Sequence, residues 1–364
     1  MADNRLSVAY NGKHCYDIVL EQGFENISAE LEQFKLSNRK ICIVTDSNVS
    51  KLYSEELKNV LSKTSKTVVV YTFEAGESNK NLDVVRRLYE FLIINHFDRN
   101  DMLAALGGGV VGDLTGFAAA TYLRGIKFIQ VPTTLLAMSD SSIGGKTGVD
   151  FDAYKNMVGA FHMPSLVYMN LSVLNSLDDR QFSAGFGEVL KHGLIKDREY
   201  YRWLEASRDD IFEKKYEYLL KMVRRNCEIK RDVVEKDPTE KGERALLNFG
   251  HTLGHAIEKL MNFSLIHGEC VGIGMIAAAY ISMNRGNITS AELNDMIRIN
   301  KLFGLPVGIK GLTPDMVVEA ASHDKKKDAD TIKFILLKSV GDAIIDTTVS
   351  KEEMSKAVEF VLGL

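Results

Sequence analysis

Three histidines close together in the chain are the residues best suited to bind a metal. His251 and His255 lie four positions apart in NFGHTLGHAIE, and His267 follows in LIHGE. A spacing of four places both imidazoles on one face of a helix. Two neutral imidazoles and one carboxylate, with open positions left over, are typical of catalytic zinc sites. The alternative is core or helix-capping histidines, but three of the chain's eight histidines within seventeen positions, each beside a glycine, favour a metal site.

The carboxylate that would complete this site is less evident from the residues alone. Glu188 lies in GFGEVLKHG, and a single glutamate on a helix is ordinarily a solvated surface residue. Lys191 follows it by three positions and therefore shares its helix face. Arg244 and Asn248 precede the histidine pair within two helical turns. These cationic and amide groups suit an anionic substrate next to the metal.

A glycine-rich segment, GGGVVGD at 107–113, contains the pattern G-x-G-x-x-G as Gly107, Gly109 and Gly112. It follows an apolar run that reads as a strand, and it opens a helical segment. In that context small residues let the backbone approach a pyrophosphate, which the N–H groups of the helix N-terminus can bind. A structural glycine turn is the alternative. The loop does not follow the first strand of the domain, so the plain dehydrogenase arrangement does not apply.

Polar side chains also follow two earlier strand segments. Asp46 and Asn48 come at the end of ICIVTD, and Glu77 and Lys80 follow TVVVYTF. Ligands bind at the carboxyl ends of strands in parallel sheets, and carboxylates can accept hydrogen bonds from ribose hydroxyls. The combination favours a dinucleotide site on the N-terminal half.

Further lysines lie in polar loops of the two halves. Lys146 falls in DSSIGGKTGVD, which we expect to be a glycine- and serine-rich turn after a strand and a short helix. Lys155 and Asn156 follow shortly, and DKKK occupies 324–327. A single lysine is usually a surface residue, but together these groups suit a substrate that carries phosphate and carboxylate.

The elements that must position these residues follow two different patterns of secondary structure along the chain. The pair Asn11-Gly12 between alternating runs predicts a β-hairpin. Strands over 41–46, 67–73, 102–109, 127–134 and 165–170, with a helix over 81–95, predict a mainly parallel, Rossmann-like sheet in an α/β domain. After about residue 177 the pattern is mostly α-helical, with a late strand pair at 331–337 and 342–348. We therefore expect an NAD-binding domain at 1–177 and a metal- and substrate-binding domain at 178–364.

Composition excludes several other classes of protein. The 364 residues include 45 basic and 49 acidic side chains, a formal charge of −4, with no basic tail for nucleic acid or a membrane surface. The four scattered cysteines predict no disulfides. The N-terminus lacks a signal-peptide pattern, and the longest apolar run, 270–283, is too short to span a bilayer and reads as a buried helix. A cytoplasmic location follows as an expectation.

The chain resembles the 3-dehydroquinate synthase family from about residue 40 to about residue 340. The resemblance is carried by GGGVVGDLTGFAAATYLRG, FIQVPTTLLAMSDSSIGGKTGVD, KNMVGAF, AGFGEVLKHGLI, RALLNFGHTLGHAIE and HGECVGIGM. It implies an α/β domain that binds NAD and a helical domain that binds a divalent metal, Zn²⁺ or Co²⁺. It also implies conversion of 3-deoxy-D-arabino-heptulosonate 7-phosphate to 3-dehydroquinate and phosphate, a step of the shikimate route to aromatic amino acids. In that reaction NAD oxidises the substrate transiently, phosphate is eliminated, and re-reduction precedes an internal aldol closure.

The resemblance also implies roles for particular residues. The metal ligands are Glu188, His251 and His267, and His255 becomes a phosphate-binding neighbour. The implied NAD contacts are Asp46, Asn48, Glu77, Lys80, Gly108, Gly109, Val110, Asp113, Thr133, Thr134, Asp140 and Lys155. The implied phosphate contacts are Lys146, Asn156, Asn248, His255 and one lysine of DKKK, for which Lys326 is the first choice among Lys325–Lys327. Lys230 and Arg244 are the implied carboxylate contacts, and Lys191 is a further implied substrate contact. Lys146, Lys191, His255 and Asp140 are the expected catalytic residues. Arg124 would reach the site of a neighbouring subunit, which implies a homodimer.

Three other functions are weighed against this one. Sister cyclases, such as 2-deoxy-scyllo-inosose synthase and the sedoheptulose 7-phosphate cyclases, share the fold, NAD and metal. We expect them to depart in SSIGGKTG and at the carboxylate-binding residues, which are intact here as Lys230 and Arg244. A metal-dependent polyol dehydrogenase, such as glycerol dehydrogenase, would release NADH. A catalytically inactive nucleotide-binding protein would show a degraded metal set or glycine loop, and neither is seen.

Overall fold

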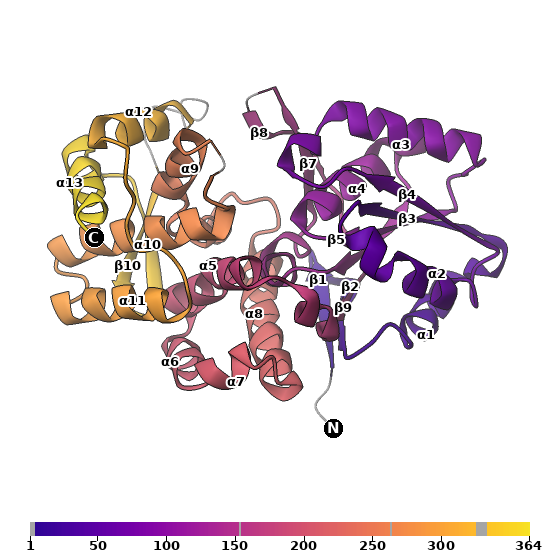
Figure 1. Ribbon diagram of the computed structural model, residues 1–364, viewed down its shortest axis with the longest axis horizontal. Coiled ribbons are helices and arrows are strands. Elements are labelled where there is room, and N and C mark those ends of the chain that lie inside the picture. The colour runs from indigo at the N-terminus through magenta and orange to yellow at the C-terminus, as the bar shows by residue number, and fades with distance from the viewer. Residues whose placement is uncertain (1–3, 153, 263, 325–332) are drawn as a thin grey trace. The chain divides into compact units, whose positions relative to one another are not determined.

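The computed structural model describes residues 4–152, 154–262, 264–324 and 333–364 (Figure 1). The chain divides into two compact units. The first comprises 1–177 with 216–238, and the second comprises 178–215 with 239–364. No helix among the described residues combines the length and the apolar character that a membrane crossing requires.

A seven-stranded sheet is the framework of the first unit, in the order β1-β2-β9-β6-β5-β3-β4. All neighbouring pairs are parallel except β1 with β2. The bounds are Arg5–Tyr10 for β1, Lys13–Glu21 for β2, Lys40–Asp46 for β3, Thr67–Phe73 for β4, Met102–Gly107 for β5, Lys127–Pro132 for β6 and Leu166–Asn170 for β9. The predicted α/β fold with a mainly parallel sheet is therefore confirmed.

The hairpin of β1 and β2 forms where the sequence predicts it. Tyr10 pairs with Lys13, which leaves Asn11 and Gly12 as a two-residue turn. Both turn residues have positive φ, 51° and 73°. This is the conformation in which a two-residue turn matches the twist of the strands, and asparagine and glycine adopt it most readily.

Helices cover the sheet through regularly spaced apolar side chains. They are α1 (Ile27–Leu31), α2 (Glu55–Leu61), α3 (Leu82–Ile94) and α4 (Gly109–Thr121). α3 begins at Asn81, whose side chain accepts a hydrogen bond from Val84 N. Val84, Leu88 and Leu92 repeat at helical spacing and pack with the apolar face of α4 in the core of this unit. α4 is thereby held with its N-terminus directly after β5.

A second hairpin, β7 (Lys146–Phe151) with β8 (Tyr154–Phe161), corrects the prediction for DSSIGGKTGVD. The turn lies earlier, at Gly144 and Gly145, which have φ of 93° and 65°. Lys146 is the first residue of a strand and not part of the turn. Glycines at 148 and 159 face each other across the hairpin, and in the sequence a glycine within a short segment reads as a turn signal.

The long helix α8 (Tyr216–Lys236) packs in the first unit, contrary to the predicted domain at 178–364. Glu235 Oε1 accepts a hydrogen bond of 2.6 Å from Ala9 N in β1. Asn226 Nδ2 donates to Ser139 O at 2.8 Å. The apolar periodicity of the segment identifies a helix with one buried face, but periodicity does not specify the partner of that face, which is distant in sequence.

The second unit is mostly helical, as predicted. Its helices are α5 (Asp179–Lys196), α6 (Arg198–Ala206), α7 (Arg208–Phe212), α9 (His251–Leu260), α10 (His267–Asn284), α11 (Ser290–Leu302), α12 (Pro314–Asp324) and α13 (Lys351–Leu362), with the antiparallel pair β10 (Phe334–Ser339) and β11 (Asp342–Asp346). α10 is buried over most of its length on all sides, so the apolar run at 270–283 is a core helix.

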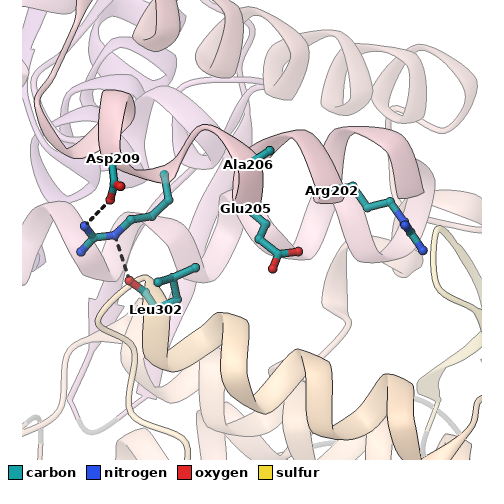
Figure 2. Close-up of a pocket in the computed structure, with 6 residues that line it drawn as sticks. Arg202, Glu205, Ala206, Asp209 and Leu302 are labelled. Carbon is teal, nitrogen blue, oxygen red and sulfur yellow. Dashed lines mark hydrogen bonds and ion pairs between the residues drawn. The ribbon is translucent and has the colours of Figure 1, made fainter.

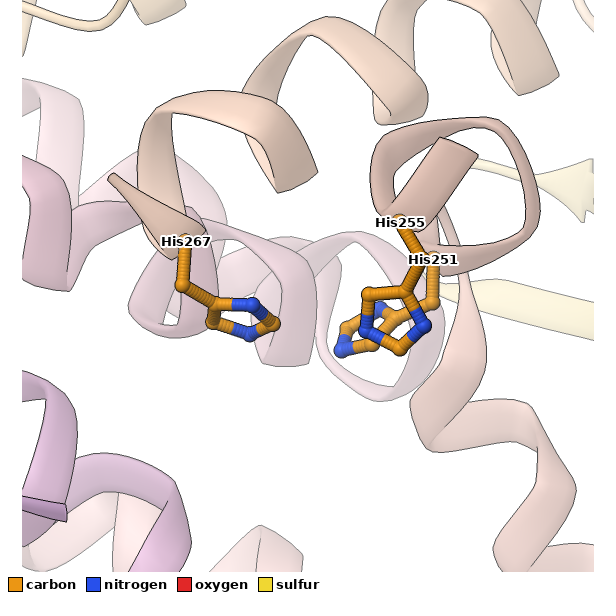
Figure 3. Close-up of side chains that lie close together, drawn as sticks. All are labelled: His251, His255 and His267. Carbon is orange, nitrogen blue, oxygen red and sulfur yellow. The ribbon is translucent and has the colours of Figure 1, made fainter. Parts of the chain in front are cut away.

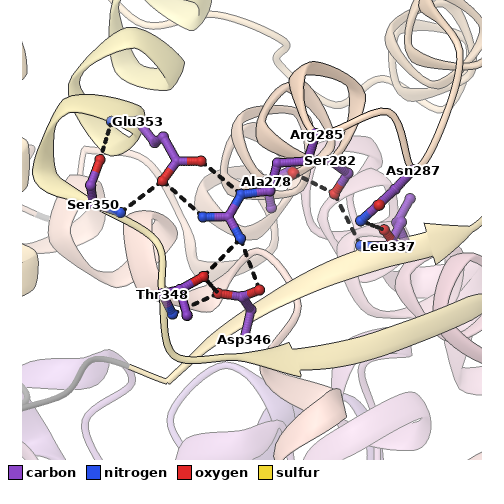
Figure 4. Close-up of polar contacts among 9 residues, drawn as sticks. All are labelled: Ala278, Ser282, Arg285, Asn287, Leu337, Asp346, Thr348, Ser350 and Glu353. Carbon is purple, nitrogen blue, oxygen red and sulfur yellow. Dashed lines mark hydrogen bonds and ion pairs between the residues drawn. The ribbon is translucent and has the colours of Figure 1, made fainter.

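Arg285 fixes the C-terminal end of α10 (Figure 4). Its guanidinium donates to both carboxylate oxygens of Glu353 at 2.7 and 2.8 Å and to Asp346 Oδ2 at 2.8 Å. One turn earlier, Ser282 Oγ accepts from Leu337 N at 3.0 Å, which ties the helix to β10. These bonds set the position of the helix whose first residue is His267.

Candidate functional site

The glycine loop lies at the point where the order of the parallel strands reverses. The chain passes from β3 outward to β4 and then returns to place β5 on the other side of β3. In Figure 1 these three strands lie side by side. Asp46 ends β3, and Gly107 ends β5 immediately before α4. Ligands of open α/β sheets bind in the crevice at such a reversal, so this location supports a dinucleotide although the loop does not follow the first strand.

A network of charges surrounds the N-terminal part of α4. Lys80 is 4% exposed, and its Nζ donates to Asp113 Oδ2 at 2.7 Å and to Asn156 Oδ1 at 2.5 Å. Lys155 Nζ lies 3.6 Å from Glu77 Oε1. The structure thus brings together four predicted NAD contacts, one of them Lys155 of β8, with Asn156, which was predicted to bind phosphate.

This network keeps Lys80 charged. Burial by itself would lower its pKa, but the negative charges of Asp113 and Glu77 outweigh burial and raise the pKa of Lys80. The backbone reinforces the arrangement, because Asp150 N donates to Lys80 O at 2.7 Å. The β7–β8 hairpin is therefore attached to the residues at the carboxyl end of β4, and the cation beside the glycine loop is fixed.

Several other predicted contacts of the first unit have local structural roles as well. Asp46 Oδ1 accepts from Asn48 N at 2.8 Å and so closes the turn after β3. Thr134 Oγ1 accepts from Ala137 N at 3.1 Å. Among the described residues, the buried Thr133 Oγ1 has no hydrogen-bond partner, as expected of a hydroxyl that contacts a ligand.

Asp140 and Lys230 form an ion pair within the first unit. Lys230 Nζ lies 2.6 Å from Asp140 Oδ1 and also donates to the Asp140 carbonyl oxygen. Asp140 is in a short π-helix, Ala137–Ser141, and Lys230 is on α8. The sequence prediction gave these residues to the cofactor and to the substrate carboxylate. Their pairing is one of the contacts that hold α8 in this unit.

The three histidines of the second unit point into a common space from two helices (Figure 3). His251 and His255 come from α9 and His267 from the start of α10. One ring nitrogen of each lies within 4.8 Å of one of each other ring. The grouping that the sequence predicts is therefore present.

Glu188 completes a set of donor atoms with two of these rings. Its Oε1 lies 3.4 Å from His251 Nε2 and 3.6 Å from His267 Nε2. Its other oxygen, Oε2, accepts a hydrogen bond from Lys191. Glu188 is fully buried, and its Oε1 has no hydrogen-bond partner among the described residues. A buried carboxylate oxygen facing two imidazole nitrogens is the arrangement that a cation would stabilise.

The two distances from Glu188 Oε1 to the imidazole nitrogens fit a tetrahedral metal. Ligand bonds of about 2.0–2.2 Å place neighbouring donors of a tetrahedron about 3.3–3.6 Å apart, and both distances fall in that range. The other nitrogens of the rings are also engaged: His251 Nδ1 is 3.1 Å from Phe249 O, and His267 Nδ1 is 3.3 Å from Glu258 Oε2. Acceptors at Nδ1 leave each Nε2 lone pair available for a metal.

Charges at the site favour the ligand forms of two of the residues. Burial would raise the pKa of Glu188, but the positive charge of Lys191 and the nearby His267 ring hold it well below its usual range. Burial and the Lys191 charge depress the pKa of His251, which is therefore neutral. Burial opposes protonation of His267 as well, yet its interactions with the carboxylates of Glu188 and Glu258 raise its pKa to about 9. In the absence of a metal, His267 therefore holds a proton near neutral pH.

Glycine contacts bring the ligand-bearing helices together. Gly187 precedes Glu188 on α5, Gly268 follows His267 on α10, and the two touch: a Cβ at Gly187 would lie 2.4 Å from Gly268 O. A Cβ at Gly268 would lie 1.8 Å from Ala184 O. No side chain larger than hydrogen fits at this crossing, so Gly187 and Gly268 set how closely the two ligand-bearing helices approach.

Comparisons with known proteins agree with this arrangement. Family models described as 3-dehydroquinate synthase N-terminal and C-terminal match residues 70–184 and 185–327. The 3-dehydroquinate synthase of Acetivibrio thermocellus is 43% identical over 348 residues, 96% of each chain.

The chain belongs to the 3-dehydroquinate synthase family.

Solved structures of sugar phosphate cyclases have the same fold as this chain. A 2-epi-5-epi-valiolone synthase from Streptomyces hygroscopicus subsp. jinggangensis 5008, with NAD⁺ and Zn²⁺ bound, matches with a TM-score of 0.90 and 29% identity over 98% of this chain and 99% of that one. A 2-deoxy-scyllo-inosose synthase complexed with carbaglucose-6-phosphate, NAD⁺ and Co²⁺ matches with a TM-score of 0.88 and 26% identity, over 98% of this chain and 100% of that one.

The structure corrects the expected placement of Arg244 and Asn248 before the histidine pair. They do not continue into the helix of the histidines, because η8 (Glu243–Asn248) is a separate 3₁₀ helix. Gly250, with φ of 81°, breaks the chain direction before α9 begins at His251. Arg244 is buried, and Asn248 Nδ2 donates to Glu240 Oε1 at 2.7 Å. Both lie in the second unit with the metal candidates.

Two further predicted residues lie at the surface of the first unit. Lys146 is exposed at the start of β7, and Arg124 is exposed in η5 (Tyr122–Arg124) with φ of 70°. Lys326, with the rest of Lys325–Lys327, lies outside the described residues.

Sequence reasoning missed the acceptors behind the metal candidates. Glu258 ends the quoted motif GHAIE and lies two helical turns after His251. The spacing of seven could have placed it on the same face of the helix, but its partner, His267, is on another helix.

A surface pocket of about 460 Å³ in the second unit contains none of the predicted site residues (Figure 2). Its lining residues are Arg202, Glu205, Ala206, Arg208, Asp209 and Leu302. Arg208 already donates to Leu302 O and Asp209 Oδ1 and lies over the Phe212 ring. The pocket lies where α6, α7 and α11 meet.

Proposed function

We propose that this protein is a 3-dehydroquinate synthase, which converts 3-deoxy-D-arabino-heptulosonate 7-phosphate to 3-dehydroquinate and phosphate. The observation that carries the proposal is 43% identity to a curated 3-dehydroquinate synthase over 96% of both chains. The strings that distinguish the family coincide with the glycine loop, the β7–β8 hairpin and the metal candidates.

NAD and a divalent metal, Zn²⁺ or Co²⁺, are the proposed cofactors. NAD supplies a reversible oxidation of the substrate, and the metal supplies Lewis-acid stabilisation of a substrate oxygen that develops negative charge. Glu188, His251 and His267 would hold the metal, which is supported by the tetrahedral spacing of their donor atoms. The residues at the strand ends and on α4 would hold NAD, which is supported by the reversal of strand order at that place.

The chain's own cations position the substrate and balance its charge. Lys146, Asn156, Asn248 and His255 are proposed to bind phosphate, and Lys230 and Arg244 to bind the carboxylate. Lys191 holds Glu188 through an ion pair and can donate a second hydrogen bond to the substrate. The elimination needs no dedicated base on the protein, because the substrate's own phosphate can accept the proton. The protein's contribution is then orientation and electrostatic stabilisation.

The sister cyclases remain the second candidate function, since they share the fold at a TM-score of 0.90. Identity separates the two: 29% to the valiolone synthase against 43% to the 3-dehydroquinate synthase. The buried Arg244 also suits a substrate with a carboxylate.

A homodimer is the proposed assembly, with Arg124 of each subunit completing the site of its partner. Its support is the family resemblance together with the exposed, left-handed backbone at Leu123 and Arg124, which presents these side chains to solvent. Location in the cytoplasm stays a prediction, which cell fractionation tests.

One assay decides the main proposal. Purified protein with Co²⁺ or Zn²⁺ and a trace of NAD should release phosphate from the heptulosonate phosphate without accumulating NADH, and a chelator should stop the release. Sedoheptulose 7-phosphate and glucose 6-phosphate serve as competing substrates. Turnover of one of these and not of the heptulosonate phosphate would assign a sister cyclase, and steady NADH accumulation would assign a dehydrogenase.

The variant Lys146→Ala separates the substrate site from the cofactor site. It should raise KM for the phosphorylated substrate and slow turnover, because a phosphate-binding cation is lost, while the dissociation constant for NAD stays unchanged. Loss of NAD binding would place Lys146 with the cofactor instead.

A further inference from the structure

We infer that Glu258 is a positioning residue for the metal: it orients His267 so that this ligand binds through Nε2. The inference rests on the proposed function, because it concerns the metal site of that function. It assigns a role to a residue outside the set of ligands, and that role can be measured without turnover.

The geometry at His267 carries the inference. Glu258 Oε2 lies 3.3 Å from His267 Nδ1, and Glu188 Oε1 lies 3.6 Å from His267 Nε2. An imidazole that donates through Nδ1 carries its lone pair on Nε2, so Glu258 selects the tautomer with a ligand atom directed at Glu188. A carboxylate is the strongest acceptor for this purpose, and it also increases the basicity of the ligand nitrogen.

Because Glu258 is on α9, this helix carries one histidine ligand and also the side chain that orients the other. His251 and Glu258 are seven positions apart on this helix, two turns along one face. His251 is directed by the Phe249 carbonyl just before α9, at 3.1 Å. His267 begins a different helix, α10, and is directed from α9 by Glu258. One helix therefore provides a ligand and also the group that orients the ligand of its neighbour.

Burial makes this contact specific. The Glu258 side chain is 5% exposed, while that of His267 is 31% exposed. Without Glu258, the Nδ1 donor of the more exposed ring can turn to water, and the ring loses its fixed orientation. Glutamate side chains are seldom this buried unless they are paired, which is consistent with Glu258 being the partner of His267.

Metal affinity of the chelated protein is the direct test. Co²⁺ is titrated into metal-free wild type, Glu258→Ala and Glu258→Gln, and its absorption gives the dissociation constant. We expect a 10- to 100-fold weaker constant for Glu258→Ala, the usual effect of losing an acceptor behind a histidine ligand. Glu258→Gln keeps an acceptor oxygen and loses only the charge, so it should fall between Glu258→Ala and wild type.

A matched control separates positioning from general damage. Glu269 is also a buried carboxylate of α10's first turn, but it pairs with Arg180 at 2.7 Å and caps the helix at Ile266 N. Glu269→Gln should lower the melting temperature of the metal-free protein while changing Co²⁺ affinity by less than Glu258→Ala does.

A spectroscopic readout completes the test. In the Zn²⁺ form of ¹⁵N-histidine-labelled wild type, His267 should show a protonated Nδ1 and a metal-bound Nε2, and Glu258→Ala should lose this pattern or populate both tautomers. Equal Co²⁺ affinity in wild type and Glu258→Ala would overturn the inference. If wild type binds Co²⁺ and depends on Glu258 but turns over no heptulosonate phosphate, the proposed activity fails while the positioning role stands.

Discussion

The glycine crossing beside the metal candidates permits a sharp prediction for Gly268→Ala. The added Cβ would lie 1.8 Å from Ala184 O, whereas real Cβ contacts are not shorter than 3.0 Å. The obstacle is backbone, which cannot rotate away, so α5 and α10 must separate locally by about 1.2 Å. Overpacking of this kind costs typically about 1–3 kcal/mol, and a backbone obstacle places this case at about 3 kcal/mol or above.

The same displacement acts on the ligands. Gly268 is adjacent to His267, and the facing helix carries Glu188, so the movement changes the separation of their donor atoms. Metal sites tolerate deviations of about 0.2 Å in ligand distance, several times less than the required shift. We therefore expect Gly268→Ala to weaken Co²⁺ binding by roughly 100-fold or more, beyond the effect of losing one orienting acceptor.

Gly272→Ala is the matched control, one turn further along the same buried helix. Its Cβ would be 3.4 Å from Leu305 Cδ1, an ordinary contact with the end of a flexible side chain. Replacing glycine within a helix should then stabilise the protein by about 0.5–1 kcal/mol. Both variants are compared by thermal unfolding without metal and by Co²⁺ titration. If Gly268→Ala unfolds and binds Co²⁺ like Gly272→Ala, the crossing does not set the ligand positions.

Further predictions concern the metal ligands, the protonation of His267 and the role of Arg124. His251→Ala should lose Co²⁺ affinity together with activity, whereas His255→Ala should keep the metal and raise KM for the substrate; metal loss in both would make His255 a ligand. The pKa of His267 is raised to about 9, so a metal must displace the proton of this ring when it binds. Calorimetry at pH 7 should therefore detect about one proton released. The affinity for Co²⁺ should rise roughly tenfold per pH unit until about pH 9. Folding also favours the protonated His267 ring, because its pKa is higher in the folded protein than in the unfolded chain. The free energy of unfolding of the metal-free protein should therefore fall as pH rises through about 9. Co-expressed Arg124→Ala and Lys146→Ala chains should regain about a quarter of wild-type activity, because half of the dimers carry one intact site of two; no recovery would mean that Arg124 serves its own subunit.

Much of the α/β unit could be predicted because its signals are local. The Asn11-Gly12 turn and the β-branched runs ending at Asp46 and Phe73 specify a hairpin and two strands within a few residues. The β7–β8 hairpin could not be predicted in this way. Its glycines serve as backbone-to-backbone contacts, and such contacts have no apolar pattern.

The metal candidates show the same division between local and distant signals. The spacing of His251 and His255 is a property of one helix, so their closeness could be predicted from the sequence. The inclusion of Glu188 depended on the family resemblance, because nothing in GFGEVLKHG shows that this glutamate is buried. Glu258 was missed since its role depends on where the N-terminus of α10 lies. Burial and the pairing of separate helices are set by tertiary packing, which one sequence does not display.

The helix α8 has a consequence for how the protein is made. Its contact with β1, between Ala9 and Glu235, spans 226 positions. During synthesis the first unit therefore stays incomplete until residue 238 is available, and by then 178–215 of the second unit have already been made. A long-range closure of this kind slows folding. A fragment ending at residue 177 would lack the helix that packs against β1 and carries Lys230, so the N-terminal half of the sequence is not an independent folding module.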